Sequence, residues 1–221
     1  MSSVRMDARV AARDVECAFE VRDGETVALT GPNGAGKSTV LGMIAGTVPV
    51  SRGAVFVGDV DVTGLPPHRR RVTLLAQDPL LFPHLSALDN VAFGPRARGS
   101  SREEANSIAG GWLESVGLAD LAHRKPRQLS GGQAQRVAVA RALAIGPDVV
   151  LLDEPLRALD ADVAPAIRDL LRTVLADVTT VLISHDPVDV RALADRAVQM
   201  VGGRVLEPRD VDLKSSGLAD S

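Results

Sequence analysis

The chain has 221 residues, of which 45% are hydrophobic and 24% are charged, and its formal net charge is −3 at pH 7. These values are ordinary for a globular protein and exclude a chain that is disordered throughout. A single cysteine, Cys17, excludes a disulfide-stabilised scaffold, and the mildly acidic balance provides no electrostatic footprint for nucleic acid. No apolar run reaches the ~18 residues that a membrane-spanning helix needs.

Apolar runs bounded by turn residues predict strands at residues 26–30, 54–57, 72–76, 149–152 and 180–183. Between them, helical patterns begin after Gly36 and cover residues 102–116, 131–145 and about 160–176. The last two strands lack period-two alternation, which is typical of strands that are covered on both faces of a parallel sheet. The alternation of strands with helices predicts an α/β fold with a mainly parallel sheet.

Two regions interrupt this alternation. Residues 83–136 contain helices and loops but no strand pattern, so we expect a helical lobe inserted into the α/β core. Residues 9–21, together with 54–62, predict a small antiparallel β piece. We therefore expect one domain over residues 1–207, followed by a polar and loose tail at 208–221.

Residues 31–39 read Gly-Pro-Asn-Gly-Ala-Gly-Lys-Ser-Thr and fit the phosphate-loop pattern G-x-x-x-x-G-K-[ST] between a strand and a helix. The glycines let backbone N–H groups approach phosphate oxygens, and the helix start adds a positive dipole end. Lys37 is one of three lysines against 22 arginines, and its compact charge suits the β- and γ-phosphates. The Ser38 hydroxyl can bind Mg²⁺. The predicted nucleotide contacts in this loop are Asn33, Gly34, Ala35, Gly36, Lys37, Ser38 and Thr39.

Residues 129–133, hereafter the signature segment, read Leu-Ser-Gly-Gly-Gln. Ser130 and Gln133 fit the S-x-x-Q capping box that opens a helix. Gly131 and Gly132 would then lie in the first turn, where each costs about 1 kcal/mol relative to alanine. Two glycines at these positions favour a ligand that contacts the backbone. We therefore expect the Ser130 hydroxyl and nearby N–H groups to bind an anion.

An apolar run ends in two adjacent carboxylates, Asp153 and Glu154. Ligands gather at the carboxyl ends of strands in parallel sheets. Asp153 can hold Mg²⁺ directly or through water, and Glu154 can polarise a water for attack on a γ-phosphate. The structural alternative is an acidic strand end that caps the next turn. His185 and Gln77 follow two other apolar runs in the same way.

Together these motifs resemble the nucleotide-binding subunits of ATP-binding cassette (ABC) transporters over about residues 5–207. The signature segment is specific to that superfamily, and the order of phosphate loop, glutamine, signature, carboxylates and histidine also matches. The resemblance implies that Gln77 contacts Mg²⁺ and starts a loop that senses the membrane partner. It further implies that Glu154 is the catalytic base, that His185 contacts the γ-phosphate and that Asp160 lies in a loop crossing between subunits. Lys37, Gln77, Glu154 and His185 form the predicted catalytic set, and Asp160 is a predicted nucleotide contact.

The resemblance also implies cofactors and partners. It predicts a homodimer with ATP and Mg²⁺ bound between the phosphate loop of one subunit and the signature of the other. It predicts permease subunits in the membrane, an indirect extracytoplasmic binding protein, a position at the cytoplasmic face of the membrane, and no nucleic acid. The sequence of residues 65–94 is most similar to that of the ATPase subunits of bacterial importers for molybdate and related oxyanions.

Three alternatives remain at this stage. One is an ABC importer or exporter of another cargo, and a second is a soluble ABC-type ATPase of DNA repair or chromosome maintenance. The third is a small-molecule kinase with a phosphate loop, which would leave the signature segment unexplained.

One feature of the resemblance is missing. ABC ATPases usually stack the adenine on an aromatic residue upstream of the phosphate loop, but this chain has no tyrosine and residues 6–16 contain no aromatic. Arg9 and Arg13 lie in that stretch, and a guanidinium plane can lie over a base. We therefore expect weak discrimination between ATP and GTP.

Overall fold

A computed structural model describes residues 2–206 and 211–212. The chain divides into two compact units. Of the described residues, the first unit contains those up to Leu74, residues 148–154 and those from Leu171 onward, and the second contains residues 75–147 and 155–170. In the described part of the chain, no helix has the length and apolar character needed to cross a membrane.

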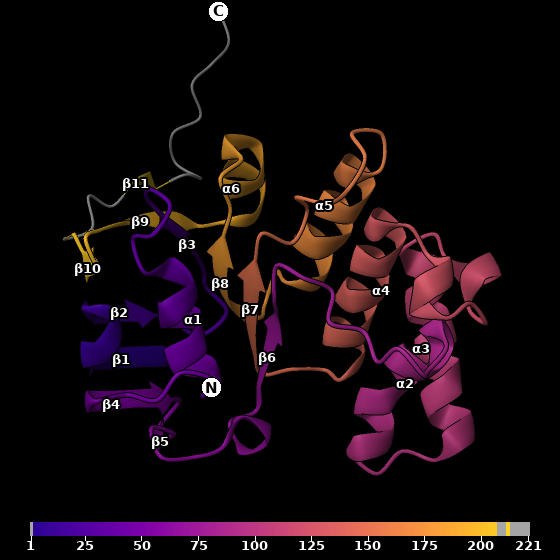
Figure 1. Cartoon of the computed structure of the whole chain (residues 1–221), viewed down its shortest axis with the longest axis horizontal. Helices are drawn as coiled ribbons and strands as arrows, with labels where there is room; N and C mark the ends of the chain where they lie inside the picture. The colour runs from indigo at the N-terminus through magenta and orange to yellow at the C-terminus, as the bar shows by residue number, and fades with distance from the viewer. Residues whose placement is uncertain (1, 207–210, 213–221) are drawn as a thin grey trace, which may run out of the picture. The chain divides into compact units, whose positions relative to one another are not determined.

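The strands form one sheet in the order β5-β4-β1-β2-β10-β9-β3-β8-β7-β6, with β11 beside β9 (Figure 1). Strands β9, β3, β8 and β7 are parallel neighbours, whereas β5, β4, β1 and β2 are antiparallel neighbours. The predicted α/β fold and its small antiparallel piece are therefore confirmed. The strands are β1 (Val4–Val10), β2 (Val15–Val21), β3 (Thr26–Thr30), β4 (Arg52–Val57), β5 (Val60–Asp61), β6 (Val72–Leu75), β7 (Val149–Asp153), β8 (Thr179–Ile183), β9 (Arg196–Val201), β10 (Arg204–Val205) and β11 (Val211–Asp212).

Burial explains the strand patterns. In β1 buried and exposed residues alternate strictly, because one face packs on the core and the other meets solvent. Every residue of β8 and all but the last of β7 are buried, as their continuous apolar runs predicted. The antiparallel piece begins at Val4, five residues before the predicted start. Of the tail expected at 208–221, only Val211 and Asp212 lie among the described residues, and they form β11.

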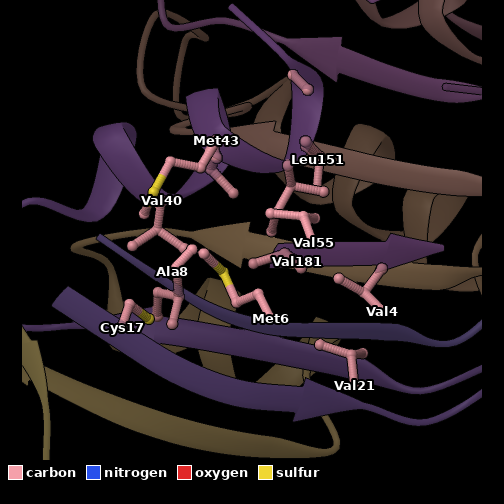
Figure 2. Packing of buried hydrophobic residues seen from close by; sticks show 14 of the residues in the cluster. Val4, Met6, Ala8, Cys17, Val21, Val40, Met43, Val55, Leu151 and Val181 are labelled. Carbon is pink, nitrogen blue, oxygen red and sulfur yellow. The ribbon is translucent and has the colours of Figure 1, made fainter. Parts of the chain in front are cut away.

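The core of the first unit packs helix α1 (Lys37–Ala45) against the inner faces of several strands. Figure 2 shows Met6 and Ala8 of β1 close to Val40 of this helix and to Cys17 of β2. Burial, with a smaller contribution from the Asp7 charge, raises the pKa of the Cys17 thiol to about 12. Cys17 is therefore a neutral packing residue.

A buried arginine fixes the end of α1 that lies away from the phosphate loop. Arg70 is 4% exposed, and its guanidinium donates to four backbone carbonyls. The acceptors are the carbonyl oxygens of Met43, Ile44, Thr63 and Leu65. Two of these are otherwise free carbonyls of the last helical turn, so Arg70 ties this helix to the segment before β6.

The second unit is helical. Helices α2 (Ala87–Ala97), α3 (Arg102–Ser115) and α4 (Gly131–Ala144) pack against one another (Figure 1). No strand occurs within residues 83–136, all of which are described, as the sequence predicted. Helix α5 (Ala164–Val174) starts four residues later than predicted because residues 161–163 form a turn after Asp160. Helix α6 (Pro187–Leu193) in the first unit was not predicted.

Candidate functional site

The loop between β3 and α1 has the backbone shape of an anion cradle. Gly31 and Gly36 have φ values of 134° and 99°, and a Cβ at Gly31 would overlap the carbonyl oxygen of Met200. Only glycine fits such positions without strain. Gly36 is the N-cap of α1 and no side chain caps this helix end. The first N–H groups of α1 therefore remain available to a ligand, at the positive end of the helix dipole.

Lys37 lies inside this loop. Its Nζ donates to the carbonyl oxygens of Gly31 at 2.8 Å and Pro32 at 2.9 Å, and the residue is 6% exposed. An ammonium has three donor protons, so one remains after these two bonds. No carboxylate neutralises the lysine in these contacts, and its charge can attract phosphate. The next residue, Ser38, is exposed at the helix start, whereas Thr39 is buried.

The predicted carboxylates and histidine come together. Glu154 Oε1 lies 3.5 Å from His185 Nε2, and the Glu154 N–H donates to the carbonyl oxygen of Ile183 at 2.9 Å. Glu154 is 8% exposed and has a left-handed φ of 52°, an uncommon backbone conformation for a residue with a side chain. Asp153 precedes it as the last residue of β7.

Strand register explains why these groups meet. Strands β3, β8 and β7 are parallel neighbours, in which Leu29 pairs with Ile183 and Ile183 pairs with Asp153. Their carboxyl ends therefore lie at one edge of the sheet. Neighbouring strands are about 4.8 Å apart, so β3 and β7 are separated by about 10 Å. The phosphate loop, Asp153, Glu154 and His185 all belong to this edge of the first unit.

The signature segment opens helix α4 in the second unit, and its predicted capping box is present. Ser130 Oγ accepts from the Gln133 N–H at 3.2 Å, and Gln133 Oε1 accepts from the Ser130 N–H at 2.9 Å. The cap uses a lone pair of Oγ and leaves the Ser130 O–H proton available to an anion. A Cβ at Gly131 would meet no atom within 4 Å, so packing does not explain the glycine at this position.

Close packing explains why residue 132 is a glycine, without any ligand. A Cβ there would lie 3.1 Å from the carbonyl oxygen of Ala158, so this turn of α4 contacts the segment after the carboxylates closely. The same helix holds that segment a second time, since the buried Gln135 donates through Nε2 to the carbonyl oxygen of Pro155 at 3.1 Å. The ligand argument drawn from the sequence therefore stands for Gly131 more clearly than for Gly132.

The remaining predicted residues lie in the second unit. Gln77 is exposed and follows β6 by two residues. Asp160 starts the turn before α5, and its carbonyl oxygen accepts from the N–H groups of Val163 and Ala164. The structure thus assigns Gln77, the signature segment and Asp160 to one unit, and the phosphate loop with Asp153, Glu154 and His185 to the other.

Arg9 and Arg13, the two arginines proposed from the sequence to lie over the nucleotide base, make different contacts. Arg13 Nη1 donates to Thr39 Oγ1 at 3.2 Å, which brings its guanidinium to the start of the phosphate-loop helix. Arg9 instead pairs with Asp14 at 3.9 Å. The sequence left both open, and the contact with Thr39 favours Arg13.

Sequence reasoning missed two polar side chains that hold the loop after Gln77. Arg141 of α4 and Asn90 of α2 bond to backbone groups of residues 79–86. Burial lowers the pKa of Arg141 from its ordinary value. Asn90 is fully buried. The signal in the sequence was weak, since each is a single polar residue on the apolar side of a helix.

A family model described as ABC transporter matches residues 15–157. The chain belongs to the ABC transporter family. Molybdenum import ATP-binding protein ModC of Mycobacterium tuberculosis (strain H37Rv) is 50% identical over 219 residues, which cover 94% of this chain and 59% of the relative. Spermidine/putrescine import ATP-binding protein PotA of Frankia alni is 45% identical over 196 residues, which cover 86% of this chain and 42% of the relative.

A solved structure of the same family agrees with the fold. It is the dimeric post-hydrolysis state of the ATP-binding cassette MJ0796 bound to ADP and Pi, and it matches with a TM-score of 0.84 and 30% identity. The match covers 96% of this chain and 99% of that one. The chain spans 59% and 42% of the lengths of the two curated relatives. The family resemblance predicted from the motifs is confirmed.

Proposed function

We propose that this chain is the ATP-hydrolysing subunit of an ABC importer. The observation that carries the proposal is the Glu154–His185 pair, 3.5 Å apart, at the same sheet edge as the phosphate loop. A phosphate cradle alone would suit any nucleotide-binding protein. A carboxylate held beside a histidine at that edge adds a group that can take a proton from an attacking water.

In this proposal the residues divide the chemistry. Lys37 and the N–H groups at the start of α1 neutralise the β- and γ-phosphates. Glu154 accepts the proton of a water whose oxygen attacks the γ-phosphorus, while the bond to the bridging β–γ oxygen breaks and ADP leaves. His185 lies against the Glu154 carboxylate, so it orients that base and can donate a hydrogen bond to a γ-phosphate oxygen.

The expected metal ligands suit Mg²⁺. Ser38, Asp153 and Gln77 offer a hydroxyl, a carboxylate and an amide oxygen, and Mg²⁺ prefers oxygen ligands with retained water and phosphate oxygens. Among the described residues, no group of three His, Cys, Asp or Glu side chains is placed so that it could hold a metal ion by itself. When bound, Mg²⁺ would supply positive charge to the β- and γ-phosphates.

We propose that two copies of the chain share each ATP. The phosphate loop of one copy and the signature segment of the other would bind the same triphosphate, with the Ser130 O–H and the Gly131 N–H directed at the γ-phosphate. Asp160, just after the carboxylates, would contribute at the interface. The dimeric state of the solved family member, with ADP and phosphate bound, supports this arrangement.

A membrane permease is the proposed partner of the second unit. Leu80 and Phe93 are 68% and 49% exposed, and the Phe82 and Phe93 rings are in contact at an interplanar angle of 46°, with their centroids 4.7 Å apart. Exposed apolar residues that gather on one face favour a protein partner. The loop that carries Leu80 follows Gln77 directly. The subunit would then work at the cytoplasmic face of the membrane, and an extracytoplasmic binding protein would deliver cargo to the permease.

For the cargo we propose molybdate or a related oxyanion, on the strength of the 50% identity to a molybdenum import protein. The alternative is another cargo, because a spermidine/putrescine import protein is 45% identical. An ATPase subunit does not contact the cargo, so its own residues do not encode this choice directly.

The test of this function uses Glu154→Gln, which keeps the side-chain shape and removes the base. We expect it to bind ATP with Mg²⁺, to lose turnover and to accumulate as a dimer in light-scattering chromatography. Glu114→Gln, at an exposed position of α3, is the matched control and should hydrolyse ATP as the parent does without accumulating a dimer. A Glu154→Gln protein that stays monomeric with ATP and phosphorylates a small acceptor would instead indicate a kinase.

A further inference from the structure

A clamp of two side chains holds the loop that follows Gln77. Arg141 of α4 donates through Nη1 to the carbonyl oxygen of Leu80 and through Nη2 to that of Pro79, both at 2.9 Å. Its guanidinium also lies over the Phe82 ring, with Cζ 5.6 Å from the ring centroid. The planar guanidinium suits this use, because its fork can bond two acceptors while its face stacks on an aromatic ring.

Asn90 of α2 forms hydrogen bonds to the same loop from another helix. Its Oδ1 accepts from the Phe82 N–H at 2.8 Å, and its Nδ2 donates to the Phe82 carbonyl oxygen at 3.2 Å and to that of Ser86 at 2.9 Å. A fully buried amide that bonds both backbone groups of one residue fixes that residue in place.

The clamped loop is unusual in two ways. Leu80 has a left-handed φ of 44°, a conformation that is a genuine outlier for a bulky residue. Its side chain is nevertheless exposed, so apolar packing does not explain why the conformation persists. Such backbone conformations persist where the surroundings over-determine them. Here the two bonds from Arg141 to the carbonyls of residues 79 and 80 provide that constraint.

Helix α4 connects this loop to two other places. Its first turn is the signature segment, and Gln135 and Gly132 of the same helix contact the segment after the carboxylates, at Pro155 and Ala158. Arg141 lies nine residues after Gly132, which is about 14 Å along a helix. If α4 moves as a rigid body, a displacement of the loop also displaces the signature segment, and a displacement of the signature segment also displaces the loop.

We propose that Arg141 is a positioning residue that couples the loop at residues 79–82, in which Leu80 is exposed, to the signature segment through α4. The proposal rests on the proposed function, because it concerns how a partner on this loop and a nucleotide at the signature segment would affect each other. Coupling between two binding sites is reciprocal. Nucleotide-driven closure at the signature segment must therefore alter the loop even when no partner is present.

The experiment places a reporter on the loop. Leu80→Cys labelled with a small thiol-reactive fluorophore keeps the backbone carbonyl that Arg141 binds, and the buried Cys17 should stay unlabelled. In a Glu154→Gln background, Mg²⁺ and ATP are added and two quantities are measured: dimer formation by light scattering, and quenching of the label by iodide.

Arg136→Met is the matched control for Arg141→Met. Arg136 lies on the same helix and also donates to two backbone carbonyls, those of Val116 at 3.0 Å and Gly117 at 3.4 Å. Those acceptors belong to a different loop. Arg141→Lys keeps the positive charge but loses the planar guanidinium that bonds two carbonyls, so its effect on the coupling should be intermediate. It replaces Arg141→Met if that variant does not fold.

We expect ATP to change the quenching constant about twofold in the parent and in Arg136→Met, and by less than about a fifth of that change in Arg141→Met, as lost coupling requires. All three should still dimerise, because Arg141 is not among the proposed nucleotide contacts. An equal change in the Arg141 and Arg136 variants, or no change in the parent despite dimer formation, would overturn the coupling proposal alone. Failure of the Glu154→Gln protein to dimerise with ATP would overturn the proposed function and the coupling with it.

Discussion

Ser130→Ala separates two roles of one hydroxyl. Its Oγ caps α4, which predicts a loss of stability, and its O–H is proposed to bind the γ-phosphate of a nucleotide held by a second copy. The chain contains a matched capping box at Ser101, where Oγ accepts from the Glu104 N–H at 3.2 Å and the Glu104 carboxylate accepts from the Ser101 N–H at 2.9 Å. These distances are the same as in the signature segment.

The structure sets the expected magnitudes. Both serines begin a 14-residue helix of the second unit, so each alanine variant should cost about 1 kcal/mol of stability. For a chain of this size that lowers the melting temperature by about 2–4 °C. Only Ser130→Ala should also lose a hydrogen bond to a charged group. Such a bond contributes about 1.5–3 kcal/mol, which corresponds to a loss of kcat/KM for ATP of roughly 10- to 150-fold.

The assay compares the melting temperature and steady-state ATPase activity of Ser130→Ala and Ser101→Ala. We expect equal melting shifts, with the activity of Ser101→Ala within about twofold of the parent, as expected for an exposed cap. Equal losses of activity in the two variants would refute the phosphate role of Ser130 and leave only the cap.

Three further predictions follow from the first unit. Lys37→Ala should lose both ATP binding and hydrolysis, because the only lysine in the loop is removed, and near-normal ATPase activity would contradict the phosphate-loop assignment. Arg13→Ala should weaken nucleotide binding about three- to tenfold, and in the parent GTP should bind within about tenfold of ATP, a gap of about 1.4 kcal/mol. Titration of both nucleotides side by side tests this, and a hundredfold preference for ATP would reveal a base contact other than Arg13. Cys17, whose pKa is raised to about 12, should resist iodoacetamide at pH 9 in the folded chain, where only ~0.1% is thiolate. It should react once the chain is unfolded, and rapid native labelling detected by mass spectrometry would be inconsistent with its burial.

The sequence predicted the centre of the sheet better than its surroundings. Strands β7 and β8 are continuous apolar runs, so their burial on both faces was visible in the sequence alone. Strand β9 was not predicted, because its residues mix polar with apolar side chains and form no continuous apolar run. It is held instead by pairing with β3 and by an ion pair of 2.6 Å between Arg196 and Glu25. Contacts between residues about 170 positions apart leave no local pattern.

The residues of the candidate site were likewise only partly identified from the sequence. Residues in motifs, such as Lys37, Glu154 and Ser130, were identified because their chemistry requires a fixed spacing along the chain. Arg141 and Asn90 bond to backbone carbonyls and N–H groups, and any sequence provides those groups. Their partners depend on how helices pack, so only the structure could assign them.

The central claim, that the phosphate loop of one copy and the signature segment of another form each site, is tested most directly by mixing two inactive variants. Lys37→Ala removes the phosphate loop's charge, and Ser130→Arg blocks the signature segment. A mixed dimer would keep one site with both parts intact. We predict that each variant alone has little ATPase activity and that a mixture recovers it, with a maximum near equal amounts. If no mixing ratio restores activity although mixed dimers form, the two-chain site is contradicted.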